Sequence, residues 1–139
     1  MITITTSGNK KVYFASDQHL GAPTAAASFP REKKFVAWLD EVKKDAEAIF
    51  LLGDLFDFWF EYKTVVPMGF VRVLGKLAEI KDSGIPIYFF VGNHDLWMHD
   101  YFETELNIPV FYSPQEFLIN NKKILMGHGD GLGPHDKGY

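Results

Sequence analysis

Short apolar runs alternate with amphipathic segments along most of this chain, and the alternation predicts a parallel sheet covered by helices. The runs at 12–15, 48–52 and 85–91 are almost continuously apolar, as in strands that are buried on both faces. Between them, apolar residues recur every three or four positions over 31–46 and 67–82, which is the spacing of amphipathic helices. These βαβ units in series indicate an α/β fold with a mostly parallel sheet.

The second half of the chain is predicted to hold shorter elements. A short helix is expected near 99–106. Further strands are expected after this helix, at 109–111, 117–119 and 123–126. Asn120 and Asn121 favour a turn between the last two strands. Because no repeat, low-complexity run or linker-like stretch interrupts the chain, residues 1–139 are expected to form a single domain.

Composition narrows the classes of function. With 14 Lys and Arg against 18 Asp and Glu, the net charge is -4, so no basic field is available and no nucleic-acid partner is expected. The absence of cysteine excludes disulfides, thiolate metal sites and a Cys nucleophile, and it fits a reducing compartment. No run approaches the roughly 20 apolar residues of a membrane span. We therefore expect a cytoplasmic protein.

Residue types that ligate metals follow the ends of the principal predicted strands. The segments are Asp17-Gln18-His19, Gly53-Asp54, Gly92-Asn93-His94-Asp95 and Gly127-His128-Gly129-Asp130. Ligands of open α/β sheets bind outside the carboxyl ends of strands, so these segments can converge. Oxygen and imidazole donors without thiolates suit Mn²⁺, Fe²⁺ or Zn²⁺. We expect two ions, with Asp54 as the bridging carboxylate because Gly53 lets the backbone turn tightly.

Each of these motifs is weak alone, but turn chemistry does not explain three histidines at strand ends. Together, in this order, the motifs resemble those of the calcineurin-like metallophosphoesterases, and the resemblance covers nearly the whole chain. It implies the αββα sandwich of that family, with the metal site at the carboxyl ends of the strands. Segments 53–59 and 128–132 further resemble the UDP-2,3-diacylglucosamine pyrophosphohydrolases of lipid A synthesis, in a form like that of Bacteroidetes.

The resemblance also implies roles for individual residues. Asp17 and His19 would be ligands of the first metal ion, and Asp54 would bridge the two ions. Asn93 and His128 would be ligands of the second ion. Mn²⁺ is the expected metal, with Fe²⁺ or Zn²⁺ as alternatives.

The implied reaction is the attack of water on the pyrophosphate of UDP-2,3-diacylglucosamine, which gives UMP and lipid X (2,3-diacylglucosamine 1-phosphate). His94 resembles the catalytic histidine outside the metal shell, and Asp95 is expected to fix its tautomer and raise its pKa. Asp130, Asp136 and Tyr139 fall where the family contacts substrate, although Asp130 also fits a turn. The alternatives are another calcineurin-like phosphodiesterase or phosphatase, or a catalytically silent metal-binding module.

One family motif is missing from this sequence. The superfamily supplies further imidazole ligands from a later Gly-His-x-His, which the chain lacks, and neither His99 nor His135 forms it. We therefore expect the N-terminal part of a longer enzyme, in which each metal lacks one histidine. The second sheet of the sandwich is expected to be lost too, so an apolar sheet face would be exposed or covered in a homodimer.

Two groups of side chains remain open to more than one interpretation. Phe56, Phe58, Trp59 and Phe60 form an aromatic cluster that suits either contact with acyl chains at a membrane surface or ordinary core packing. Asp57 is expected to orient the loop after Asp54 rather than to bind metal. If the substrate is an acylated UDP-sugar, the protein is expected at the cytoplasmic face of the inner membrane.

Overall fold

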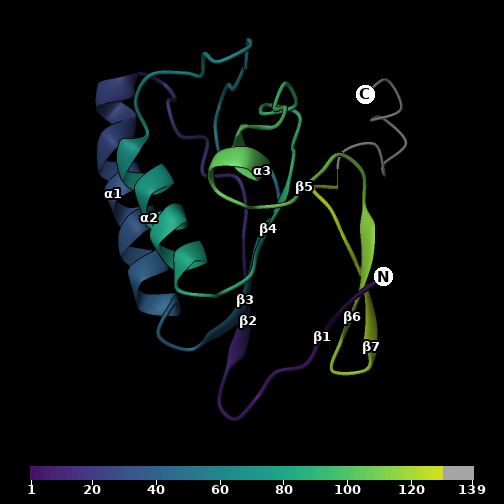
Figure 1. Cartoon of the computed structure of the whole chain (residues 1–139). Helices are drawn as coiled ribbons and strands as arrows, with labels where there is room; N and C mark the ends of the chain where they lie inside the picture. Colours follow the sequence, from purple (N-terminus) through teal and green to yellow (C-terminus); the bar gives the residue numbers. More distant parts are fainter. Residues whose placement is uncertain (130–139) are drawn as a thin grey trace.

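The computed structural model describes residues 1–129, which form two facing sheets with helices on the outer face of one of them (Figure 1). The larger sheet has the strand order β2-β3-β4-β5, and its neighbouring strands are all parallel. Its strands are β2 (Lys11–Ala15), β3 (Ala46–Leu51), β4 (Ile87–Phe90) and β5 (Val110–Phe111). The helices are α1 (Ala25–Val42), α2 (Val71–Asp82) and α3 (Tyr101–Glu105). The predicted α/β fold with a mostly parallel sheet is confirmed.

A second, smaller sheet is present, contrary to the expectation that this layer would be lost. It consists of β1 (Ile2–Ile4), β6 (Gln115–Ile119) and β7 (Lys122–Met126). β1 pairs parallel with β6, and β6 pairs antiparallel with β7. The two sheets share an apolar core made of Ile4, Ala48, Phe50, Phe90, Phe117, Ile119 and Met126. The strand that the sequence pattern did not predict, β1, has only Ile4 buried, so it carries no alternation to recognise.

The two long helices pack side by side on the other face of the larger sheet (Figure 1). α1 begins at Ala25, six residues before its predicted start, because Thr24 caps it: the Thr24 hydroxyl accepts a hydrogen bond from the Ala27 N–H at 3.1 Å. α2 begins at Val71 rather than at 67. The buried carboxylate of Glu32 accepts a bond from the Val73 N–H at 3.1 Å, which satisfies a donor in the first turn of α2.

The loops that follow β2, β3, β4 and β7 lie together at one end of the sandwich. Parallel strands β2, β3 and β4 place their carboxyl ends at the same edge of the larger sheet. The loop after β7 reaches this edge from the smaller sheet, since the ring of His128 lies against the backbone of Leu52, just after β3. No helix within residues 1–129 has the length and apolar character needed to cross a membrane.

Candidate metal centre

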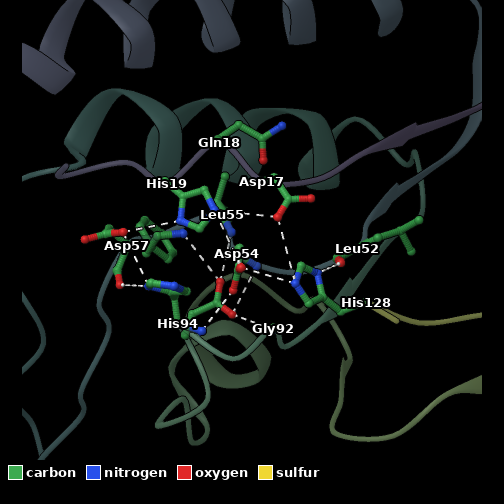
Figure 2. Close-up of polar contacts among 12 residues, drawn as sticks. Asp17, Gln18, His19, Leu52, Asp54, Leu55, Asp57, Gly92, His94 and His128 are labelled. Carbon is green, nitrogen blue, oxygen red and sulfur yellow. Dashed lines mark hydrogen bonds and ion pairs between the residues drawn. The ribbon is translucent and has the colours of Figure 1, made fainter. Parts of the chain in front are cut away.

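The four predicted ligand loops meet around Asp54, whose side chain is 4% exposed (Figure 2). Ligand atoms of His19, Asp54 and His94 all lie within 4.8 Å of one another, and so do those of Asp17, Asp54 and His128. Figure 2 shows Asp54 between His19 and His94 on one side and His128 on the other. A carboxylate shared by two such groups is the arrangement expected of a bridging ligand.

Distances within the two groups show how closely the donor atoms converge. The Asp54 Oδ2 atom lies 3.1 Å from His128 Nε2 and 3.6 Å from His19 Nε2. The Asp17 Oδ1 atom lies 3.6 Å from His19 Nε2 and 3.8 Å from His128 Nε2. The structure therefore places Asp17 between the histidines of the two expected ions, rather than beside His19 alone.

His128 is held so that one ring nitrogen is directed into the site. Its Nδ1 atom lies 2.8 Å from the carbonyl oxygen of Leu52, so an N–H at Nδ1 can donate to that oxygen. In the neutral ring the lone pair is then on Nε2, the atom that faces Asp54. A backbone carbonyl on the far nitrogen is a common way to orient a metal-binding histidine.

Two glycines allow the loops to approach one another. A Cβ atom on Gly53 would lie 2.6 Å from Nδ1 of His128, and one on Gly92 would lie 2.2 Å from Oδ1 of Asp54. Both distances are shorter than contacts that real Cβ atoms make. Gly53 also has a φ of +100°. Any larger residue at either position would separate the ligand loops.

Three expected ligands have left-handed backbone conformations. The φ angles are 64° at Asp17, 47° at His19 and 54° at Asp54. Such a conformation costs roughly 1–2 kcal/mol for a residue with a Cβ atom, so surrounding contacts must maintain it. The N–H of Asp17 donates to the carbonyl of Gly53 at 3.0 Å, and that of His19 donates to the carbonyl of Asp54 at 2.9 Å. The first two ligand loops therefore hold each other in place.

Asp95 is fully buried, and its predicted role beside the ring of His94 is wrong. Its carboxylate instead accepts backbone N–H bonds of 2.7 to 3.4 Å, from Gly92, Asp54, Leu55 and Phe56. Burial raises the pKa of Asp95 above its usual range, while these hydrogen bonds act in the opposite direction. Asp95 therefore braces the loop after β3 against the loop after β4.

The residue that contacts the His94 ring is Asp57. The Nδ1 atom of His94 lies 3.0 Å from the carbonyl oxygen of Asp57 and 3.4 Å from its Oδ1 atom. The same Oδ1 atom lies 3.3 Å from Nδ1 of His19. The ring centroids of His19 and His94 are 4.8 Å apart. Sequence reasoning missed this role, although the Asp54-x-x-Asp57 spacing already pointed to a second carboxylate in the loop.

For the remaining predicted site residues, Asn93, Asp130, Asp136 and Tyr139, the structure does not establish a role. Asn93 is half-buried on the loop that carries His94, and its role as a ligand remains a prediction. Asp130, Asp136 and Tyr139, predicted to contact substrate, lie outside the described residues. Within the described residues, the donor set fits divalent ions of borderline to hard character, because it combines carboxylates and imidazoles around one shared oxygen ligand.

Comparison with known proteins agrees with this geometry. The family model described as calcineurin-like phosphoesterase matches residues 10–137. The chain belongs to this family. The predicted resemblance is thereby confirmed, and membership implies that the protein binds divalent metal.

The chain is also similar to curated proteins named UDP-2,3-diacylglucosamine hydrolase. The relative from Porphyromonas gingivalis is 45% identical over 120 residues, which cover 86% of this chain and 46% of the relative. The relative from Haemophilus influenzae is 31% identical over 133 residues, covering 94% of this chain and 53% of the relative. The relative from Edwardsiella ictaluri is 30% identical over 126 residues, which cover 91% of this chain and 47% of the relative. The chain thus spans about half the length of the curated relatives it matches.

Proposed function

We propose that this chain carries the dimetal centre of a hydrolase that cleaves the pyrophosphate bond of UDP-2,3-diacylglucosamine, giving UMP and lipid X. The observation that carries the proposal is the position of Asp54 in both groups of ligand atoms. The choice of substrate is supported by the 45% identity to the Porphyromonas gingivalis relative of that name. Mn²⁺ is the proposed metal, and Fe²⁺ and Zn²⁺ suit the same donors.

Each ligand loop contributes a defined part of the proposed centre. Asp17 and His19 would hold the first ion, Asn93 and His128 would hold the second, and Asp54, which belongs to both groups of donor atoms, would bind both. Bound divalent ions polarise phosphoryl oxygens and lower the pKa of water. Hydrogen bonds between the first two loops hold Asp17, His19 and Asp54 in left-handed conformations, so these side chains are oriented before substrate arrives.

His94 is the proposed proton donor to the leaving oxygen. Its side chain is 43% exposed, so substrate can reach the ring. With Nδ1 turned toward Asp57, Nε2 is the atom that can hold a proton for the leaving group. Both contacts to Asp57 lie on the Nδ1 side of the ring, so they orient the imidazole and leave Nε2 for the substrate.

Exposed aromatic residues near the site support a contact with acyl chains or with the inner membrane. Of the predicted cluster, Phe56 and Trp59 are buried in the core, whereas Phe58 is 62% exposed and Phe60 46% exposed. Phe60 pairs with Trp97, which is 57% exposed. Side chains of this kind insert into lipid interfaces. We propose that they attach the protein to the cytoplasmic face, and binding of the chain to phospholipid vesicles tests it.

A homodimer is also part of the proposal. Phe14 is 46% exposed and Leu125 is 61% exposed, although each lies on a strand of the sandwich. A second copy that covers these side chains would remove apolar surface from water. Light scattering after gel filtration tests this directly, since a mass of one chain would rule the dimer out.

The reaction itself is tested by metal stoichiometry together with substrate hydrolysis. Mn²⁺ binding would be measured first, then release of UMP from UDP-2,3-diacylglucosamine and hydrolysis of bis-p-nitrophenyl phosphate, with the Porphyromonas gingivalis relative as the positive control. Two ions and UMP release support the proposal. If only the simple diester is hydrolysed, the protein is a phosphodiesterase or phosphatase that acts on another substrate than UDP-2,3-diacylglucosamine. If metal binds and neither compound is hydrolysed, the chain is a catalytically silent metal-binding module.

A further inference from the structure

Arg31 reaches from α1 to the loop that follows β2. Its Nε atom donates a hydrogen bond to the carbonyl oxygen of Gln18 at 2.8 Å. Its Nη2 atom donates to the carbonyl oxygens of His19 and Ala22, both at 2.7 Å. The side chain is half-buried between the helix and the loop. One guanidinium thus holds three carbonyl groups of a single loop.

This loop carries two of the proposed ligands in conformations that it would not adopt unaided. Asp17 and His19 both have positive φ angles, of 64° and 47°. On the sheet side, their N–H groups donate to the carbonyls of Gly53 and Asp54. On the helix side, the loop's carbonyls are held by Arg31. The backbone of the loop is therefore held from both sides, and on the side away from the sheet the hydrogen bonds come from Arg31.

The geometry of these contacts requires an arginine. A guanidinium is planar and offers five N–H donors in a fixed arrangement, so it can bind carbonyls that lie in different directions. A lysine ammonium is a compact charge at the end of a flexible chain and lacks a donor at the Nε position. Arg72 is the chain's other arginine, and its guanidinium lies 4.6 Å from the centre of the Phe29 ring. It provides a matched comparison outside the ligand loops.

We propose that Arg31 is a positioning residue for the metal centre. By binding the carbonyls of Gln18, His19 and Ala22, it keeps the Asp17 carboxylate and the His19 imidazole where an ion can use both. The inference rests on the proposed dimetal centre, and it adds a residue that contacts neither the ions nor the substrate. Loss of an outer partner of this kind typically lowers metal affinity 10–100-fold, and we expect a reduction in that range.

The experiment compares Mn²⁺ binding by the wild-type chain and three variants. Arg31→Met keeps an apolar side chain but removes all the donors, Arg31→Lys keeps the charge, and Arg72→Met is the matched control. Amide hydrogen exchange of the metal-free proteins is followed separately in residues 16–22 and 92–96. Thermal unfolding shows whether each variant is folded. None of these measurements requires hydrolysis.

Arg31→Met is expected to raise the Kd for Mn²⁺ about 10–100-fold and to speed exchange in 16–22 but not in 92–96. Arg31→Lys should recover only part of the affinity, and Arg72→Met should match the wild type. Wild-type affinity in Arg31→Met, or complete rescue by lysine, would overturn the role of the guanidinium. If Arg31→Met does not fold, Arg31→Lys decides the question. A wild-type chain that binds no Mn²⁺ would instead refute the metal centre, and this inference with it.

Discussion

Replacing Gly92 by alanine tests whether the metal centre depends on the close approach of two loops. The added Cβ atom would lie 2.2 Å from Oδ1 and 2.6 Å from the backbone nitrogen of Asp54, whereas ordinary contact begins at 3.4 Å. The loops after β3 and β4 must therefore separate by about 1 Å, because the backbone nitrogen cannot rotate away. Overpacking of this kind costs about 1–3 kcal/mol of unfolding free energy. The same shift moves Asp54 relative to His94, and a misplacement of about 1 Å can lower a catalysed rate about 10²-fold.

Gly75→Ala is the matched control, since it makes the same chemical change in the middle of α2. Among residues 1–129, no heavy atom beyond its immediate chain neighbours and its own helix would lie within 4 Å of a Cβ atom at this position. Alanine there should stabilise the protein by about 0.5–1 kcal/mol. Both variants are measured by thermal or urea unfolding and by Mn²⁺ titration. Gly92→Ala is expected to lower the unfolding free energy, and Gly75→Ala is expected to raise it. If Gly92→Ala is as stable as the wild type and binds Mn²⁺ with the same Kd, the reasoning is refuted.

Three further predictions concern acidic and imidazole side chains of the centre. Asp54→Ala should abolish Mn²⁺ binding at both positions, and a titration that still shows two ions would refute the bridging role. His94→Gln should lower UMP release about 10²–10⁴-fold while the Mn²⁺ stoichiometry stays unchanged, so loss of metal would make His94 a ligand instead. Asp95→Asn replaces one acceptor oxygen by a donor and leaves backbone N–H groups unpaired, which should cost about 1–3 kcal/mol in urea unfolding. Because burial raises the folded-state pKa of Asp95, its ionisation favours the unfolded chain, and its contribution to stability declines as the pH rises above 3.8. The unfolding free energy of Asp95→Asn should lack this decline, and identical pH profiles for the two proteins would contradict it.

The strands that carry the ligands could be predicted because their apolar runs end abruptly in polar residues. β2, β3, β4 and β7 all follow this pattern, so the sequence alone predicts the convergence of Asp17, Asp54, His94 and His128 that the structure shows. The start of α1 was missed because the first turn, after Thr24, is rich in alanine and shows no amphipathic spacing. β1 was missed since a strand of three residues at a sheet edge has no periodicity to detect.

The supporting residues of the site could not be predicted because their roles depend on contacts between distant segments. Asp95 follows His94 directly, which suggested a contact between their side chains, but neighbouring residues of a tight loop point in different directions. Its carboxylate meets the N–H groups of a loop some 40 positions earlier. In the sequence, Arg31 is indistinguishable from the other charged residues of the predicted helix. Only the packing of α1 brings its side chain to the carbonyls of Gln18 and Ala22.

The ligands of the centre come from both sheets, and this has a consequence for how the domain holds together. His128 follows the last strand of the smaller sheet, whereas Asp17 and Asp54 follow strands of the larger one. An ion bound by Asp54 and His128 would act as a cross-link between positions 54 and 128, in the manner of a disulfide that closes a long loop. Chelation should then lower the melting temperature and free the smaller sheet to exchange its amides first. Metal supply would thus govern the assembly of the sandwich as well as its chemistry.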